Sequence, residues 1–345
     1  MSRDIWKYIT VEQCNEFLLS FQLLGETTLS NKEQITCLYS LSNTLEKHYE
    51  QYTLVKSNGG TRKITKPDER LKLVQKNILA NILSQRSVSI YATAYQKGVG
   101  LIMNAQPHTE KQQILKLDIE DFFDSISFSQ VYAYGFPRSY FPKATAGLLT
   151  NLCCYNHCLP QGAPTSPMIS NLVLRSFDDS IGQWCVEKGI SYTRFCDDMT
   201  FSGTFDATTV KNKVQAFLVE LGFSLNKKKT RVISKHEQQT VTGIVVNEKS
   251  QAPRTYRKQL RQEIYYCMKF GVSSHIARKT AVAPHLIEQR TIENYLLSLL
   301  SKTNFILQIN PLDEEFLQAR TQLKVLLTEP VSYTHLDVYK RQVYR

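Results

Sequence analysis

The spacing of apolar side chains divides the first part of the chain into three predicted segments. Residues 1–50 repeat apolar positions every three or four residues, which is the period of a helix. From 52 to 66 the pattern becomes strand-like, and Gly59 and Gly60 supply a turn in its middle. Residues 71–83 return to the helical period. We therefore expect an N-terminal helical segment, a β-hairpin and a further helix.

A clean alternation of apolar and charged residues predicts a strand over 113–119. Leu115, Leu117 and Ile119 share one face, and Asp118 lies on the other face with charged neighbours on either side of it. The pattern therefore predicts a strand with one buried face and one charged face.

The middle of the chain alternates predicted strands with predicted helices. Ser166 is expected to cap a helix that has Pro167 at its first position and ends near Gly189. Further strands are expected at 190–195, 199–202, 223–233 and 240–246, with a helix at 210–221. This order is that of a split βαβ unit, an antiparallel sheet backed by helices. Beyond residue 253 the chain is expected to be helical.

Length and composition limit the class of protein. The 345 residues are 42% hydrophobic and 21% charged, which suffices for a sizeable core in two or three domains or in one domain with lobes. No stretch approaches 18 uncharged apolar residues, so no membrane span and no membrane partner are expected. Charged side chains within the first twenty residues interrupt any signal-peptide core. We therefore expect a soluble, cytoplasmic protein.

The charge balance points to a polyanionic partner. Lys and Arg number 42 against 31 Asp and Glu, a net charge of +11, although such a balance also fits proteins of membrane surfaces. The eight cysteines are expected to be free thiols, because the chain is long and carries no export signal.

The last fifteen residues have an unusual origin. The segment 331–342, VSYTHLDVYKRQ, back-translates into an inverted repeat that looks like two copies of a sequencing-library transposon end. We therefore interpret 331–345 as a sequencing-adaptor artefact that takes no part in the fold. It carries +2 of the total +11, so the remaining +9 still indicates a polyanion.

Three carboxylates are candidates for catalysis. Asp118 lies on the polar face of one predicted strand, and Asp197 and Asp198 form the tip of a predicted hairpin. Carboxylates brought together in this way repel one another unless cations neutralise them, and oxygen ligands suit Mg²⁺. Two Mg²⁺ ions would stabilise the attacking and leaving oxygens of a phosphoryl transfer. Asp is also common in ordinary turns, but the charged strand face and the element order favour a polymerase palm.

Four motifs in order resemble those of reverse transcriptases, most closely those of bacterial retrons. LDIEDFFDSI over 117–126 is similar to the first palm motif, and QGAPTSP over 161–167 matches the pattern QGxxxSP. FCDD over 195–198 stands where the family usually has Tyr-Ala-Asp-Asp, and LGFSLNKKKT over 221–230 resembles the next motif. The departures are Phe195 for Tyr, which leaves the metal ligands intact, and Cys196, interpreted as a small apolar filler whose pKa the nearby carboxylates raise.

The resemblance runs from about residue 56 to about residue 310 and implies the fold. It is an α+β, right-hand polymerase with a ferredoxin-like palm, fingers and a helical thumb. The implied domains are an N-terminal helical extension over 1–50, fingers and palm over 51–250, and the thumb over 251–330.

The resemblance also assigns residues to the incoming deoxynucleotide. Phe123 would pack under its sugar and exclude a 2′-hydroxyl, Gln161 and Gly162 would approach the base pair, and Lys56 and Arg62 would hold the triphosphate. The alternatives are a core phenylalanine, a loop before a helix, and solvated strand charges.

Two short segments favour the retron group. NAQPH, from Asn104 to His108, resembles the NAxxH motif, and Val241, Thr242 and Gly243 form the VTG triplet; both are expected to contact RNA. The alternative for His108 is a satisfied surface histidine. A zinc site is a weaker hypothesis, because the spacing lacks paired ligands and the segment matches an ordinary helix end in the family. Its residues would be Cys153, Cys154, His157 and Cys158.

A basic helix face is expected in the thumb. Its members recur at i, i+3, i+4 and i+7, with few acidic residues nearby, and are predicted to track nucleic-acid phosphates rather than to be merely solvated. They are Arg254, Arg257, Lys258 and Arg261.

The resemblance implies an RNA-directed DNA polymerase that uses two Mg²⁺ ions and deoxynucleotides. Retron enzymes copy a dedicated structured noncoding RNA, prime from its 2′-hydroxyl to make branched multicopy single-stranded DNA, and usually act in antiphage defence with an effector protein. The alternatives are a group II intron-type reverse transcriptase and an RNA-binding scaffold for an effector.

Overall fold

The computed structural model describes residues 5–55 and 59–328, which divide into two compact units, one up to Gln239 and one from Thr240 onward. The division falls earlier in the chain than the predicted limit at 250. Each unit is described separately below, and Lys56 and the segment 331–345 lie outside the described residues.

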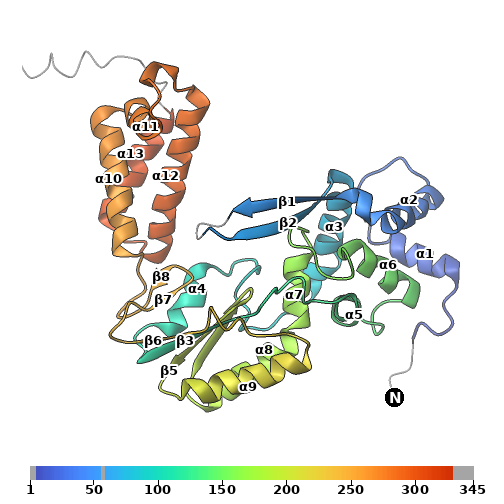
Figure 1. Cartoon of the computed structure of the whole chain (residues 1–345). Coiled ribbons are helices and arrows are strands. Elements are labelled where there is room, and N and C mark those ends of the chain that lie inside the picture. Colours follow the sequence, from blue (N-terminus) through green and yellow to red (C-terminus); the bar gives the residue numbers. More distant parts are fainter. Residues whose placement is uncertain (1–4, 56–58, 329–345) are drawn as a thin grey trace, which may run out of the picture. The chain divides into compact units, whose positions relative to one another are not determined.

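The first unit begins with two capped helices and a long hairpin (Figure 1). Helices α1 (Val11–Leu19) and α2 (Asn31–Asn43) each start with a capping box, in which a Thr or Ser side chain and the Gln or Glu three residues later bond to each other's backbone amides. Strands β1 (Tyr49–Val55) and β2 (Thr61–Pro67) pair antiparallel, and α3 (Glu69–Asn81) follows. These elements confirm the helices and the hairpin predicted from the sequence.

Four antiparallel strands form the central sheet of the first unit. They are β3 (Gln113–Asp118), β4 (Ser191–Phe195), β5 (Asp198–Gly203) and β6 (Arg231–Ser234), in the order β4-β5-β3-β6. With helices after the first and third of these strands, this order is the ferredoxin-like arrangement expected for a palm.

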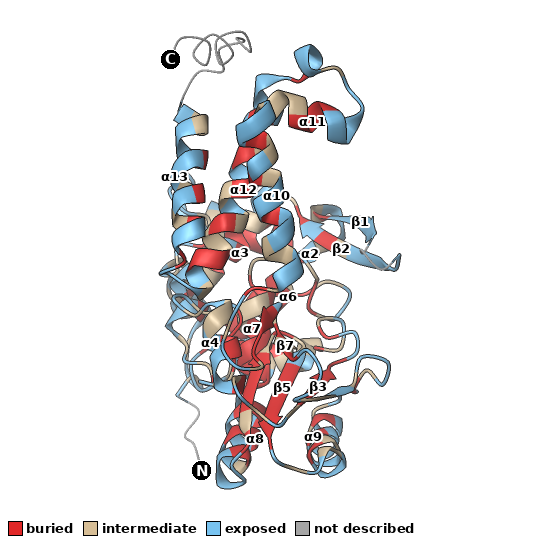
Figure 2. Ribbon diagram, turned by 90° about the vertical axis from the view of Figure 1, so that its left-hand side faces the viewer, coloured by how far each residue is buried: buried red, intermediate tan, exposed pale blue. Residues whose placement is uncertain are grey.

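Strand β3 differs from its prediction because it is a central strand. Its alternate faces are both covered: Ile114 and Leu117 are buried, and Asp118 is only 3% exposed. Figure 2 shows β3 and β5 as largely buried ribbons. Asp118 is therefore buried within the protein, whereas Lys116 is half-buried and Glu120, just beyond the end of the strand, is exposed.

The helix predicted after Ser166 is in fact two helices. Thr165, not Ser166, is the residue before the first turn of α7 (Ser166–Val173), and Leu174 separates α7 from α8 (Arg175–Glu187). Gly189, with φ of +66°, ends the pair as expected. Helix α8 lies beside α9 (Ala207–Glu220) against the sheet (Figure 1), where Phe177 and Phe217 make an edge-to-face contact.

The strand predicted over 223–233 is largely a loop. Only Arg231–Ser234 pairs with β3, while Leu225 makes an isolated bridge to Ile119 and the amide of Asn226 donates to the carbonyl of Asp118. The alternating apolar residues of this segment fill the core without forming a ladder.

Short helical elements connect these parts of the first unit. They are η1 (Leu45–His48), η2 (Leu83–Gln85), α4 (Leu101–Ala105), η3 (Gln106–His108), α5 (Phe128–Gln130), the π-helical turn η4 (Val131–Gly135) and α6 (Lys143–Cys153).

The second unit is a small hairpin followed by helices with their own core. The predicted strand over 240–246 is instead the hairpin β7 (Thr240–Val241) and β8 (Ile244–Val245). Then follow α10 (Arg254–Phe270), α11 (Val272–Thr280), η5 (Pro284–Leu286), α12 (Gln289–Ile309) and α13 (Glu314–Thr328). Buried Leu260, Leu299 and Phe316 belong to their shared core, as expected for a helical thumb. Among the described residues, no helix is long and apolar enough to cross a membrane.

Candidate active site

The three predicted aspartates line one pocket of about 610 Å³ in the first unit. Asp118 ends β3 and Asp198 begins β5, and the two residues face each other in the strand register. Asp197 belongs to the tight turn between β4 and β5. The antiparallel pairing of β3 with β5 therefore brings carboxylates 80 residues apart in the sequence to one place.

Asp118 is the most unusual of these carboxylates. Its Oδ2 accepts a hydrogen bond from Lys229 Nζ at 2.7 Å, whereas its buried Oδ1 accepts none from any described residue. Burial raises the pKa of Asp118 to about 6, and the charge of Asp197 adds to this effect against the opposing influence of Lys229. Burial and the charge of Asp197 also raise the pKa of Asp198. The pocket thus holds more negative charge than its protein cations neutralise.

The donor chemistry of this pocket fits hard divalent cations. Carboxylate oxygens are the ligands that Mg²⁺ prefers, and Asp118 offers a desolvated oxygen that accepts no hydrogen bond within the described part of the chain. The ammonium group of Lys229 pairs with the other oxygen, Asp118 Oδ2. In the positions shown, no three Asp, Glu, His or Cys side chains within 5–55 and 59–328 form a group that could hold a metal ion.

The predicted nucleotide-binding residues of the first unit are close to the aspartates. Phe123, Arg62 and Gln161 line the same pocket, and Arg62 is exposed on β2. Phe122, the neighbour of Phe123, is 5% exposed and belongs to the core. The roles of these residues toward a nucleotide stay predictions.

Gly162 is needed for a contact within the protein. Its φ is +137°, and a Cβ added to it would lie 2.6 Å from the carbonyl oxygen of Thr65. The amide of Thr65 also donates to the carbonyl of Gln161 at 2.9 Å. Gly162 therefore lies against the backbone of β2, which fastens the hairpin to the loop before α7, and its approach to a base pair stays a prediction.

Asn104 and His108 do not lie on the surface, so the expectation that they offer exposed RNA contacts is wrong. His108 is fully buried and its ring nitrogens bond to Ser202 Oγ at 2.7 Å and Thr193 Oγ1 at 2.8 Å. Asn104 is 1% exposed and accepts a hydrogen bond from Thr93. The NAxxH segment attaches α4 and η3 to the palm sheet, which satisfies its polar groups internally.

The VTG triplet forms the turn of the hairpin in the second unit. Val241 is buried, while Thr242 and Gly243 have φ of +46° and +82°. Positive φ at both central residues is typical of the tight turns that join antiparallel strands. The contact of this triplet with RNA stays a prediction.

The basic face of α10 is only partly free for phosphates. Arg257 pairs with Asp313, and Arg261 Nη2 donates to Glu315 at 2.7 Å, so these two arginines are neutralised within the second unit. Arg254 and Lys258 are exposed and form no ion pair with any residue that the structure describes. Two of the four predicted cations therefore have carboxylate partners, and the contact of this face with phosphates stays a prediction.

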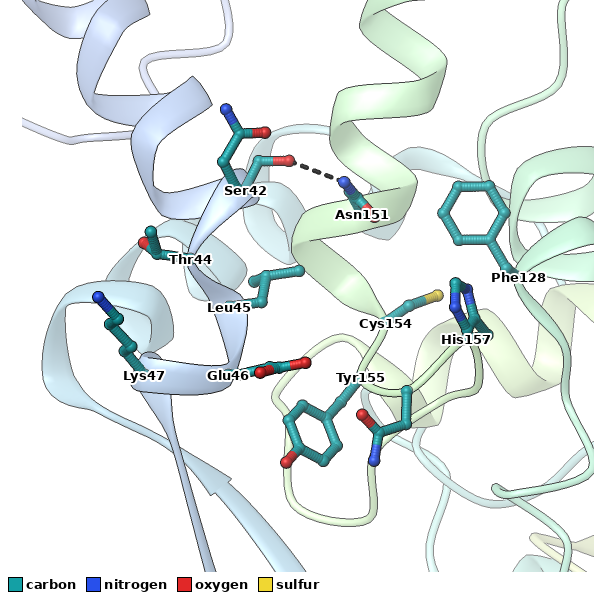
Figure 3. Close-up of a pocket in the computed structure, with 12 residues that line it drawn as sticks. Ser42, Thr44, Leu45, Glu46, Lys47, Phe128, Asn151, Cys154, Tyr155 and His157 are labelled. Atoms are coloured by element: carbon teal, nitrogen blue, oxygen red, sulfur yellow. Dashed lines mark hydrogen bonds between the residues drawn. The ribbon is translucent and has the colours of Figure 1, made fainter.

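The cysteine-rich segment is not gathered into a metal-binding group among the residues that the structure describes. Figure 3 shows Cys154 and His157 beside a separate pocket of about 660 Å³, which the end of α2 and the end of α6 also line. Burial raises the pKa of Cys153 to about 12 and raises those of Cys154 and Cys158, which disfavours the thiolates that zinc requires. No metal-binding group was found within the described ranges.

Two features of the site were missed by the sequence argument. Lys229 is one of three consecutive lysines, and the sequence alone does not indicate which of them turns toward Asp118. Arg194 looks like an ordinary charge on a strand, yet it is fully buried and bonds to the carbonyl of Cys196.

Cys196 itself is 9% exposed and accepts a hydrogen bond at Sγ from Tyr95. Its pKa is raised to about 12, mainly by burial and secondarily by the charge of Asp197. The position of Cys196 is therefore consistent with a small apolar filler, although burial raises its pKa more than the nearby carboxylates do.

Comparisons with known proteins agree with this geometry. A family model described as "Reverse transcriptase (RNA-dependent DNA polymerase)" matches residues 54–246. The retron Ec86 reverse transcriptase of Escherichia coli is 32% identical over 282 residues, covering 76% of this chain and 87% of the relative. The retron Mx65 reverse transcriptase of Myxococcus xanthus is 33% identical, with 66% of this chain and 58% of the relative covered.

A solved telomerase from Candida albicans is a more distant neighbour. It is 12% identical with a TM-score of 0.44, and 89% of this chain and 70% of that chain are covered. The assignment rests instead on the matched family model, the sequence relatives and the ferredoxin-like palm. The chain belongs to the reverse transcriptase family, as a relative of the retron enzymes, and is an RNA-directed DNA polymerase.

Proposed function

We propose that this polymerase copies a dedicated structured noncoding RNA into branched multicopy single-stranded DNA, with Asp118, Asp197 and Asp198 holding two Mg²⁺ ions. The observation that carries the proposal is the pocket in which these carboxylates meet, where one buried oxygen of Asp118 has no hydrogen-bond donor among residues 5–55 and 59–328. The retron relatives support the choice of an RNA substrate of this kind.

The catalytic work would be divided among the chain's own residues. Asp118, Asp197 and Asp198 would draw together around the cations, which supply charge stabilisation for the attacking and leaving oxygens. Lys229 holds one oxygen of Asp118 in place. Phe123 would exclude a ribose 2′-hydroxyl, Arg62 would bind the triphosphate of a deoxynucleotide, and Gln161 would contact the base pair.

Priming is a question of geometry rather than of different catalytic groups. The palm needs a hydroxyl aligned with the α-phosphate, and a folded RNA held outside the pocket can present an internal 2′-hydroxyl there. Arg254 and Lys258 of the second unit are the exposed cations that we propose for RNA phosphates. The resemblance to retron enzymes further implies that the branched DNA and an effector protein would act together in antiphage defence in the cytoplasm.

The product made on the cognate RNA tests this proposal. The RNA is found by searching the DNA that flanks the gene for an inverted repeat, and is incubated with the full chain, deoxynucleotides and Mg²⁺. After ribonuclease treatment, a branched product keeps a ribonucleotide at its 5′ end that only a debranching enzyme removes. A product with a free 5′ end, or one primed only from 3′ ends, contradicts the retron function and leaves a reverse transcriptase of another kind.

The same assay separates the enzyme from a scaffold. A chain that binds the RNA but incorporates no deoxynucleotide under any divalent cation would support the scaffold alternative.

A further inference from the structure

A buried ion pair lies directly behind the turn that carries Asp197. Asp178 of α8 and Arg194 of β4 are both completely buried. Arg194 Nε donates to Asp178 Oδ1 at 2.9 Å, and Arg194 Nη2 donates to Asp178 Oδ2 at 2.6 Å. This is the two-pronged geometry that fixes the plane of a guanidinium group.

The remaining nitrogen of the guanidinium reaches the turn. Arg194 Nη1 donates to the carbonyl oxygen of Cys196 at 2.8 Å. Cys196 precedes Asp197 and has a φ of +61°, a left-handed conformation that is uncommon for a residue with a side chain. The ion pair thus bonds to the peptide group that leads into the two aspartates.

The rest of the network holds the ion pair itself. Asn171 Oδ1 accepts from Arg194 Nη2 at 3.1 Å, and Asn171 Nδ2 donates to the carbonyl of Ala94. Tyr192 donates its hydroxyl hydrogen to Asp178 Oδ1 at 2.8 Å. Helices α7 and α8 and the segment before α4 are therefore tied to one guanidinium group.

Stability alone is a weak reason to keep such a pair. The desolvation of two buried charges offsets most of their attraction, and well-packed apolar residues of similar volume often serve as well. What apolar residues cannot supply is a fixed donor for the Cys196 carbonyl. Strained backbone at a functional turn persists only where its surroundings hold it.

We propose that Asp178 and Arg194 are positioning residues: Asp178 orients the guanidinium of Arg194, which fixes the Cys196 carbonyl and thereby aims the carboxylates of Asp197 and Asp198. This inference rests on the catalytic role proposed for those two aspartates. Neither Asp178 nor Arg194 lines the active-site pocket, so their effect is exerted through the turn.

A double substitution separates positioning from stability. Arg194→Met or Asp178→Leu alone leaves one buried charge unpaired and should lower the melting temperature. The double variant removes both charges, so its melting temperature should recover relative to the single variants. It still lacks the donor to Cys196, so kcat should stay about 10–100-fold below that of the unchanged protein, the usual effect of losing a supporting group around a metal site.

The cation dependence gives a second readout. The double variant should need more Mg²⁺ for half-maximal activity, and Mn²⁺ titration followed by electron paramagnetic resonance should show weaker binding without any turnover. The KM for deoxynucleotide should change much less than kcat, because Arg62, Phe123 and Gln161, the residues proposed to bind it, are kept.

Two further variants make the test decisive. Arg194→Lys keeps the charge opposite Asp178 but loses the guanidinium nitrogen that donates to Cys196. It should fold and show the same loss of kcat, so it tests the inference even if the double variant does not fold. Gln75→Leu is the matched control, because the buried Gln75 bonds to Tyr49 and the carbonyl of Leu152 elsewhere in the same unit. It should lower the melting temperature and leave kcat and cation dependence unchanged.

The opposite results overturn the inference. A folded double variant, or Arg194→Lys, with the kcat and cation dependence of the unchanged protein would leave the pair a purely structural role. Asp197→Asn is measured in parallel: an active Asp197→Asn enzyme would show that the proposed active site is wrong, a failure distinct from that of the positioning role.

Discussion

At the scale of single residues, the site combines carboxylates with too little compensating charge. Asp118, Asp197 and Asp198 share a pocket, and Lys229 is the cation bonded directly to one of them. Such a group of charges is unfavourable in a folded protein unless a ligand neutralises it. The arrangement is therefore understood best as a binding site and predicts which residues are indispensable.

Replacing Asp197 by Asn should nearly abolish DNA synthesis. The change removes one charge and one good cation ligand, which costs transition-state stabilisation worth on the order of 10³-fold in rate. Single-turnover primer extension with Mg²⁺ measures the effect. Asp179→Asn, which changes a half-exposed aspartate of α8 that pairs with Arg175, is the control and should keep full activity. Near-normal extension by Asp197→Asn would refute the assignment.

Replacing Phe123 by Ala should weaken the discrimination between deoxynucleotides and ribonucleotides. Phe123 is half-buried at the pocket, and removing its ring opens space where a 2′-hydroxyl could fit. The ratio of dNTP to NTP incorporation should fall, whereas Phe122→Leu in the core should leave it unchanged. An active Phe123→Ala enzyme with an unaltered ratio would show that Phe123 is an ordinary core residue.

At the scale of elements, the palm is held together by contacts that local patterns indicate only in part. The strand and helix periods predict the ferredoxin-like order, because periodicity reflects which face is buried. The segment 223–230 is an exception, since Phe223 and Leu225 alternate with polar residues as in a strand but are buried in a loop. The salt bridges of α10 also escape it, because the partner carboxylates of Arg257 and Arg261 lie more than fifty residues later in the chain.

The attachment of η3 to the sheet should make stability depend on pH. Burial lowers the pKa of His108 to about 3, from an ordinary value of 6.5. Between these values the unfolded chain binds a proton that the folded protein does not, so stability is fully present above pH 6.5 and falls as the pH drops. The loss is about 1.4 kcal/mol per pH unit, or about 2 kcal/mol at pH 5.

Urea unfolding at pH 7.5 and pH 5 measures this contribution. His108→Gln should be less stable at pH 7.5 but should lose less stability on acidification. His236→Gln, at an exposed position, should behave like the unchanged protein. Equal acid sensitivity of His108→Gln and the unchanged protein would show that His108 is not the titrating group.

The contact between β2 and the loop before α7 should not tolerate a side chain at Gly162. Ala there would bring its Cβ within 2.6 Å of the Thr65 carbonyl oxygen, at a φ of +137°. We expect a loss of more than about 1 kcal/mol in unfolding free energy, measured by urea denaturation. Gly147→Ala, where a Cβ meets open space on α6, should be neutral or stabilising by up to about 1 kcal/mol. Equal stability of the two variants would contradict this account of Gly162.

At the scale of the whole molecule, the basic residues behind the net charge of +11 fall into those paired within the protein and those available to a ligand. Some basic residues already have partners within the protein, as Lys279 has in Glu263 and Arg257 has in Asp313. Others, such as Arg254 and Lys258, are exposed without an ion pair among the described residues. The two groups should respond differently to substitution, although Arg257 shares helix α10 with Arg254 and Lys258.

Charge reversal at Arg254 and Lys258 should weaken RNA binding without unfolding the protein. Each phosphate contact releases condensed counterions, so each lost contact should lower the slope of log affinity against log salt by about 0.7–0.9. The measurement is RNA affinity of Arg254→Glu and Lys258→Glu across a series of salt concentrations, with melting temperatures recorded for the same variants. Affinity should fall for unrelated RNA sequences alike, because phosphates carry no sequence information.

Arg257→Glu is the informative contrast on the same helix. It places a carboxylate beside Asp313 and Glu315 and removes a guanidinium that also stacks 4.9 Å from the Phe316 ring centroid. Its main effect should be a lower melting temperature of the helical unit, because repulsion replaces an ion pair that is partly shielded from water. The opposite result would be a stable Arg257→Glu variant with a lower salt slope, while Arg254→Glu and Lys258→Glu leave the slope unchanged. In that case Arg257 exchanges its α13 carboxylate partners for RNA phosphates, and the paired arginines form the RNA-binding face.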